Sequence, residues 1–564
     1  MKIRFISINI LLALIILSAF FIRYSFIELP NLYYDENGVV IWVKLFLNGE
    51  LSPWAYLMAM PPPLLAWITS VPFIIFGASE FSLRIVNVFF GTLTVVLLYF
   101  IAKQWYGRKV ALLAAALLAV SPLHVTYSRL NVNSDIVEAF FLVFAVFIME
   151  YCYTHNLERK KDLSAVILSG IAFGFSLLAK FNALVLWGIY WVSIFLFSAR
   201  EKLKLNLRRL IISNLIALLL VIMSTGFKLS NIFYLIYGFF YAAVAQSTLY
   251  ANPFYYRVLL LVDALSPLIF LIFIISLIYM AANAYKKRQR SDIIVLSLVS
   301  ASVLITILQP RSGARHFLII VPFLVVVISK FIIDFSLKIR KPKFLGTIII
   351  LIVVISSASW AIYEIKKDTH YTIWKDVTKY INNNVPEHAV VYSIYPYWPL
   401  AYSIGNTFLT FLIERNVSMV PSFSSAKKGD IFVLGNFDGT FDISRQQPFS
   451  GALEIFGKEV YRRKLRPYPR TEEFIKKNGE LIKTFYCNQE ECIWLYKIKD
   501  INKTLVKEFG EDEKWSFFAG EESRNNFFSF SCSLIKKKPF SSFIRKLDDK
   551  IASSVEAKCK NFPA

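Results

Sequence analysis

Long apolar runs recur through the first 362 residues of this 564-residue chain. A helix needs about 20 such residues to cross the hydrocarbon core of a bilayer. In all, 56% of the residues are hydrophobic and the mean hydropathy is +0.53, whereas soluble globular chains are roughly 45–50% apolar. The chain after residue 362 is mixed and polar. The sequence therefore predicts a membrane domain over residues 1–362 and a soluble domain over residues 363–564.

The lengths of the apolar runs predict an α-helical polytopic protein with about eleven spans. The first run follows Lys2 and Arg4, as in a secretory signal peptide, but it is long and no small-x-small cleavage site follows. We therefore expect an uncleaved anchor. The runs lie near 3–22, 84–102, 109–123, 136–153, 163–179, 183–198, 210–226, 258–283, 292–309, 316–334 and 345–362.

Lys and Arg between the runs predict the orientation, since basic loops mark the cytoplasmic side. With a cytoplasmic N-terminus, every second turn carries a basic cluster and the domain 363–564 is extracytoplasmic. The net charge of +23 then reflects an anionic membrane surface, and no nucleic-acid partner is expected. We predict a multi-pass protein of the cell (plasma or inner) membrane. The clusters include Lys103, Arg108 and Lys109; Arg159 to Lys161; Arg200 to Arg209; Lys286 to Arg290; and Lys338 to Lys343.

The apolar segment from Leu64 to Gly77 is too short for a span. It has 14 residues, follows three prolines, and would reverse the charge pattern downstream if it crossed the membrane. We expect a short helix in the outer interface, within an outer loop over residues 23–83. A loop of that length usually has a function.

Acidic residues stand at two places on the predicted outer face. Asp35 and Glu36 are adjacent in the loop, and Asp135 begins the fourth span. Carboxylates near hydrocarbon are costly and usually functional. A solvated turn or a helix N-cap would also explain them. A carboxylate at this surface could accept a proton from an acceptor hydroxyl or amine while a sugar leaves phosphate.

Isolated basic residues lie on the same predicted face. Each alone could be a residue at the end of a span whose long side chain places its charge at the membrane–water interface. Together with the acids they predict a site for an anionic, membrane-borne substrate, because Arg and Lys bind phosphate. The candidates for phosphate binding are Lys180, Arg315, Arg129 and Arg257.

Short motifs follow one another in a fixed order over residues 1–335. They are Asp35-Glu36, Gly49, Pro62-Pro63-Leu64, Trp67, Phe76-Gly77, Arg84, Gly91, Ser121-Pro122, Ser128-Arg129, Asp135, Gly170 to Lys180, Arg315 to Leu318 and Pro322. In these motifs the chain resembles the protein O-mannosyltransferases and aminoarabinose transferases of glycosyltransferase C fold. Weaker similarity at Val390 to Tyr392 and Asp430 to Leu434 suggests the small outer α/β domain of some members.

The resemblance implies roles for particular residues. It makes Asp35 the general base for the acceptor, Asp135 a second acid of the outer cavity, and Arg315 and Lys180 ligands of the lipid phosphate. We count Glu36 with the two aspartates as a catalytic candidate. The family often has Glu, His or Lys before the double proline, but here Ala59-Met60 stand there, which leaves the acceptor open. The Trp-Trp-Asp signature of oligosaccharyltransferases is absent, so transfer of a whole glycan to asparagine is not expected.

These observations predict a glycosyltransferase that moves a hexose or pentose from a polyprenyl phosphate to a lipid, glycan or protein. No cofactor is required and no metal ligand is assigned, although two carboxylates on one face could hold a divalent ion. The main alternative is a transporter or flippase of lipid-linked sugars, for which internal repeats and midplane breaks would be typical. A second alternative is a non-catalytic partner that binds glycan or protein through its outer domain.

Three further features carry weaker predictions. Apolar alternation around a polar turn predicts a hairpin at 484–496, where Cys487 and Cys492 could form a disulfide if the domain lies outside. The aromatic loop at 227–257 is either an interfacial belt or a cover over the donor. Asp263, inside the eighth span, is a candidate partner of Arg257.

Overall fold

The structure is a computed structural model. The residues that it describes are 2–28, 36, 39–40, 43, 46–47, 64–131, 134–155, 157–197, 200–227, 254–308, 314–338, 344–369, 373–386, 389, 391–393, 428–429, 431–435, 476–477, 479–487 and 490–499. The predicted base Asp35 and most of the aromatic loop 227–257 lie outside this set.

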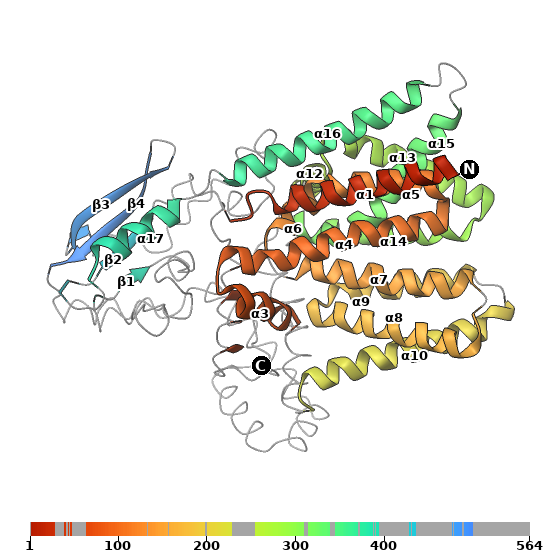
Figure 1. The fold of residues 1–564 in the computed structure, drawn as a ribbon, viewed down its shortest axis with the longest axis horizontal. Coiled ribbons are helices and arrows are strands. Elements are labelled where there is room, and N and C mark those ends of the chain that lie inside the picture. Colours follow the sequence, from red (N-terminus) through yellow and green to blue (C-terminus); the bar gives the residue numbers. More distant parts are fainter. Residues whose placement is uncertain are drawn as a thin grey trace.

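The first part of the chain is a bundle of antiparallel helices (Figure 1). Among the described residues, eight helices are long and apolar enough to cross a membrane, or nine if α5 and α6 form one bent span. The helices are α1 (Lys2–Tyr24), α3 (Leu64–Phe76), α4 (Glu80–Tyr106), α5 (Arg108–Ala119), α6 (Pro122–Arg129), α7 (Asp135–Thr154), α8 (Arg159–Ala179), α9 (Asn182–Phe197), α10 (Arg200–Ser224), α12 (Phe254–Leu265), α13 (Pro267–Lys287), α14 (Arg290–Leu308), the 3₁₀ helix η1 (Ala314–Ile320), α15 (Val321–Lys338) and α16 (Phe344–Thr369).

Each of the eleven predicted runs coincides with helix, but the number eleven is not established as a number of spans. The apolar parts of α1 and α9 are shorter than a full span. The predicted single span 258–283 is two helices, α12 and α13. Pro267 starts α13 after Ser266, whose φ is +75°, because proline cannot donate the backbone hydrogen bond that would continue α12.

The helix directions separate the bundle into two ends. At the basic end, α1, α5, α8, α10 and α14 begin and α4, α13 and α15 finish (Figure 1). At the opposite end, which we call the site end, α1 finishes and α3, α4, α7 and α9 begin. The described members of the predicted basic clusters all lie at the basic end, as the charge pattern predicts. The side of the membrane that each end faces stays a prediction.

The segment after the three prolines is a short helix, as predicted. Helix α3 has 13 residues, too few for a span, and it packs against α4 and α8 at the site end (Figure 1). Its placement in the membrane interface stays a prediction.

A small sheet follows the last helix of the bundle. Helix α17 (Ile373–Asn384) packs on a four-stranded sheet of order β1-β2-β4-β3. Among the described strands, β1 and β2 pair in parallel and the other neighbours are antiparallel. The predicted hairpin is confirmed, with Cys487 opposite Glu490, while the side chains of the proposed disulfide lie outside the described set. The domain boundaries stay a prediction. The strands are β1 (Val391–Ser393), β2 (Ile431–Gly435), β3 (Gly479–Cys487) and β4 (Glu490–Ile498).

Candidate functional site

Glu36 anchors the long loop to the bundle through a buried ion pair. Its carboxylate accepts two hydrogen bonds from Arg84, of 2.8 Å from Nε to Oε1 and 2.7 Å from Nη2 to Oε2. Both side chains are fully buried. The backbone N–H of Asn131 also donates to Oε1, at 2.7 Å. A solvated turn therefore does not describe Glu36, and this geometry favours an anchoring role. A catalytic role for Glu36 stays an untested prediction.

The start of α4 places Arg84 within reach of Glu36. Ser79 is the N-cap, and it exchanges side-chain and backbone hydrogen bonds with Ser82 in a capping box, which fixes where a helix begins. Arg84 then lies in the second turn, and its Nη1 also donates to the carbonyl of Ile27 at 2.6 Å. One guanidinium thus holds both the turn after α1 and the loop residue beside Asp35.

Asp135 and Lys180, both predicted as site residues, form an ion pair at the same end. Their side chains are 4% and 21% exposed, and the buried Asp135 Oδ2 atom has no hydrogen-bond partner among the described residues. Ser134 is the N-cap of α7 and Asp135 is its first helical residue. A carboxylate there is favoured by the helix dipole. The structure therefore joins two of the predicted residues across 45 positions of sequence.

Glu138 lies on α7 three residues after Asp135, and the sequence analysis did not predict it as a site residue. It is fully buried, and its Oε1 accepts the backbone N–H of Ala183 at 2.7 Å. This bond satisfies a donor at the start of α9, where helices leave N–H groups unpaired. Glu138 thereby fixes the turn that carries Lys180. The signal in the sequence is an acid one turn after Asp135 within an apolar run, where ionisable residues tend to be functional.

The remaining predicted phosphate ligands, Arg129, Arg257 and Arg315, differ in what they contact. Arg129 ends α6 and donates to the carbonyls of Ser25 and Phe26, and Arg257 donates to the carbonyl of Ile307 at 2.6 Å. These bonds connect Arg129 to the turn after α1 and Arg257 to α14, and a phosphate-binding role for either cation stays a prediction. Arg315 is partly buried in η1. The side chain of Asp263 is not described, so its pairing with Arg257 stays a prediction.

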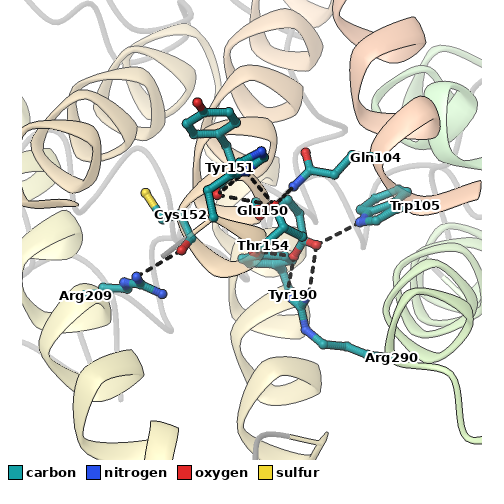
Figure 2. Close-up of polar contacts among 10 residues, drawn as sticks. Gln104, Trp105, Glu150, Tyr151, Cys152, Thr154, Tyr190, Arg209 and Arg290 are labelled. Carbon is teal, nitrogen blue, oxygen red and sulfur yellow. Dashed lines mark hydrogen bonds and ion pairs between the residues drawn. The ribbon is translucent and has the colours of Figure 1, made fainter. Parts of the chain in front are cut away.

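A second buried polar cluster, around Glu150, lies at the basic end, and the sequence analysis did not predict it either. The fully buried Glu150 of α7 accepts hydrogen bonds from Trp105 of α4 at 2.8 Å and Tyr190 of α9 at 2.9 Å (Figure 2). Arg290 of α14 binds both carboxylate oxygens, at 2.5 and 3.1 Å, and stacks on the ring of Tyr153. One carboxylate therefore connects four helices.

Among the described side chains, no group of three or more His, Cys, Asp or Glu could hold a metal ion. Asp35 lies outside that set, so the expectation about a divalent ion stays a prediction.

Comparison with known sequences shows which family part of the chain is similar to. The model of dolichyl-phosphate-mannose-protein mannosyltransferases matches residues 60–227. YycA of Bacillus subtilis (strain 168), named as a candidate mannosyltransferase, is 28% identical over 188 residues, which are 33% of this chain and 25% of YycA. An uncharacterized protein of Aquifex aeolicus (strain VF5) is 28% identical over 173 residues, 29% of this chain and 32% of that protein. The matches thus span about a quarter to a third of the curated relatives.

Solved structures share the fold of this chain, although their sequence identity to it is low. ArnT from Cupriavidus metallidurans, bound to undecaprenyl phosphate, gives a TM-score of 0.59 at 14% identity, covering 86% of this chain and 97% of ArnT. AglB from Archaeoglobus fulgidus, in complex with an inhibitory peptide and a dolichol-phosphate, gives 0.53 at 15% identity, covering 71% and 63%. The resemblance that the motifs indicate is confirmed: the family model of dolichyl-phosphate-mannose-protein mannosyltransferases matches residues 60–227, and the chain shares the fold of these solved membrane proteins.

Proposed function

We propose that this protein is a membrane glycosyltransferase that transfers a sugar from a polyprenyl phosphate to an acceptor at the site end of its bundle. One observation carries the proposal. The buried Glu36–Arg84 pair ties the residue next to Asp35 to the end of the bundle where Asp135 and Lys180 also meet. Acids and bases from distant parts of the sequence thereby converge at one end of a glycosyltransferase fold.

The chemistry needs a base and a neutralised leaving group. In the proposed step, an acceptor hydroxyl attacks the anomeric carbon of the donor sugar, and the bond from that carbon to the phosphate oxygen breaks. Asp35 takes the hydroxyl proton as the nucleophile forms its bond. The polyprenyl phosphate leaves with the electron pair, and Arg315 and Lys180 stabilise its charge. Glu36 keeps the loop in place without exchanging a proton.

The carrier class is supported by what the solved neighbours hold, undecaprenyl phosphate in ArnT and a dolichol-phosphate in AglB. The sugar is a hexose or a pentose, and the acceptor is a lipid, a glycan or a protein. We place the site end on the outer face of the cell membrane, with the N-terminus in the cytoplasm. This orientation follows from the basic clusters at the other end of the bundle.

The phosphate role of Arg315 predicts a change in donor affinity. We expect Arg315→Ala to raise the apparent donor KM about 10-fold or more, because a charge-assisted hydrogen bond contributes about 1.5–3 kcal/mol. The measurement is transfer at varied concentrations of a polyprenyl-phosphate sugar. Arg288→Ala, which removes an exposed cation at the basic end, is the matched control. An unchanged donor KM in Arg315→Ala would remove Arg315 from the phosphate site.

The anchoring role of Arg84 predicts loss of activity when the pair is broken. Arg84→Met leaves the Glu36 carboxylate buried without its cation, which costs about 3–5 kcal/mol. We expect the loop to detach and kcat to fall about 100-fold or more, since small displacements of reacting groups have effects of this size. The check is kcat per folded molecule, with Arg108→Met, an exposed cation, as the control. Wild-type kcat in Arg84→Met would show that the pair does not hold the base.

A further inference from the structure

The pair of helices α5 and α6 is bent by 53° at a short break. Val120 and Ser121 separate them, and Pro122 starts α6. The last carbonyls of a helix have no partner within it, and in an apolar interior each must be satisfied by another group. The break at the end of α5 therefore needs donors from elsewhere in the fold.

Local backbone N–H groups of Val120 and Ser121 bond to the carbonyls of Ala116 and Leu118, and Arg23 of α1 supplies further donors. Its fully buried guanidinium donates to the carbonyls of Ala119 at 2.9 Å and Leu118 at 3.0 Å. It also donates to Nδ1 of His124, in the first turn of α6, at 2.8 Å. The hydroxyl of Ser357, from α16, donates to the carbonyl of Val120 at 3.0 Å. The broken span is thus held at its break by side chains from two other helices.

Helix α6 is fixed on its other sides as well. All eight of its residues are buried. Gly91 of α4 lies so close to Ser128 that a Cβ atom added to the glycine would collide with the serine side chain. Arg129 at the end of α6 donates to the carbonyls of Ser25 and Phe26, just after α1. Helices α1 and α6 therefore each bind the other through an arginine.

Just after α6, the chain reaches Asn131, which contacts Glu36. The side-chain amide of Asn87 donates to the carbonyl of Leu130, and that of Asn131 donates to the carbonyl of Leu83, both at 2.6 Å. The backbone N–H of Asn131 then donates to Glu36. Arg23 is thus linked to Glu36 through the chain of α6, with hydrogen bonds at the start of the helix and just after its end.

We propose that Arg23 is a positioning residue for the transfer site: by bonding to carbonyls at the α5–α6 break, it holds α6 and Asn131 where Asn131 fixes Glu36, which is next in sequence to the proposed base. This rests on the proposed function, in which Asp35 accepts the proton. In the proposed mechanism the donor phosphate is bound by Arg315 and Lys180, and none of the hydrogen bonds described above involves either residue. Arg23 is therefore expected to affect kcat and to leave donor KM unchanged.

The test combines amide hydrogen exchange with kinetics on the full chain in detergent or lipid. The variant is Arg23→Met. Its control is Arg209→Met, because Arg209 is also a buried arginine that pairs with a carboxylate and a carbonyl, those of Asp162 and Cys152, but at the basic end. If Arg23→Met does not fold, Arg23→Lys takes its place with the same two readouts. Lysine keeps the positive charge but lacks the planar guanidinium that donates several hydrogen bonds at once.

We expect Arg23→Met to speed exchange over residues 122–131 and to lower kcat per folded molecule about tenfold or more, with donor KM unchanged. Arg209→Met should instead speed exchange at the start of α10 and keep wild-type kcat. Unchanged exchange over residues 122–131, or wild-type kcat in Arg23→Met, would overturn the proposal. If the wild-type protein transfers no sugar, the proposed function fails, and the exchange measurement alone decides whether Arg23 holds α6.

Discussion

We expect the Asp35→Asn protein to lose sugar transfer while it still binds the lipid donor. A positioned general base contributes about 10²–10⁴-fold to a rate, and asparagine cannot accept the acceptor's proton. Binding should persist because Arg315 and Lys180, which bind the donor phosphate in the proposed mechanism, are unchanged. The measurement is single-turnover transfer alongside direct binding of a polyprenyl-phosphate sugar.

The control for Asp35→Asn is another acid at the same end of the bundle. Glu80 lies in the first turn of α4 and takes no part in the proposed chemistry, so Glu80→Gln should keep kcat close to wild type. Full activity in Asp35→Asn would contradict the assignment of the base. Loss of donor binding in that variant would show that the loop, and not the proton transfer, had been damaged.

The largest loss of stability is expected from Glu150→Ala at the basic end. The substitution leaves the Arg290 guanidinium without its carboxylate and removes the acceptor of Trp105 and Tyr190. Removing one partner of a buried pair costs about 3–5 kcal/mol. We expect that loss in the free energy of unfolding, measured by denaturant titration in detergent, while kcat per folded molecule changes little because the cluster lies away from the site end.

Two comparisons make the Glu150 result specific. Glu158→Gln removes an acid whose pair with Lys161 is largely exposed, and such pairs contribute about 0–1 kcal/mol. The double variant Glu150→Leu with Arg290→Leu should recover the part of the loss that comes from the unpaired Arg290, since apolar residues can replace a buried pair at little cost, while Trp105 and Tyr190 still lack their acceptor. A change below about 1 kcal/mol in Glu150→Ala would contradict the view that this cluster joins the four helices.

The features that the sequence predicted well are those that local pattern determines. Apolar length located the helices, charge pattern separated the two ends, and alternation around a turn located the β3–β4 hairpin. Residues 64–76 form a short helix, as their length and the preceding prolines indicate. These predictions need only neighbouring residues, because span length and loop charge are local quantities.

The features that could not be predicted from the sequence are contacts between residues that lie far apart in the chain. Glu150 meets Arg290 across 140 positions, and Arg23 meets Ala119 across 96. Pro122 and Pro267 are visible in the sequence, yet an apolar run that contains a proline can continue as one kinked helix. Whether it breaks depends on donors from other helices, such as Arg23. Asp135 and Lys180 were predicted on one face, but their direct pairing became apparent only in the fold.

The most direct test of the proposed function is transfer from a defined donor by the purified protein in proteoliposomes. A set of radiolabelled polyprenyl-phosphate sugars, hexoses and pentoses on dolichyl and undecaprenyl carriers, would be supplied with membrane lipid, glycan and protein acceptors. The account predicts that one label leaves its carrier, appears on an acceptor and releases an equal amount of polyprenyl phosphate. A label that crosses the bilayer on its intact carrier, with no free polyprenyl phosphate, would contradict the account and indicate a flippase.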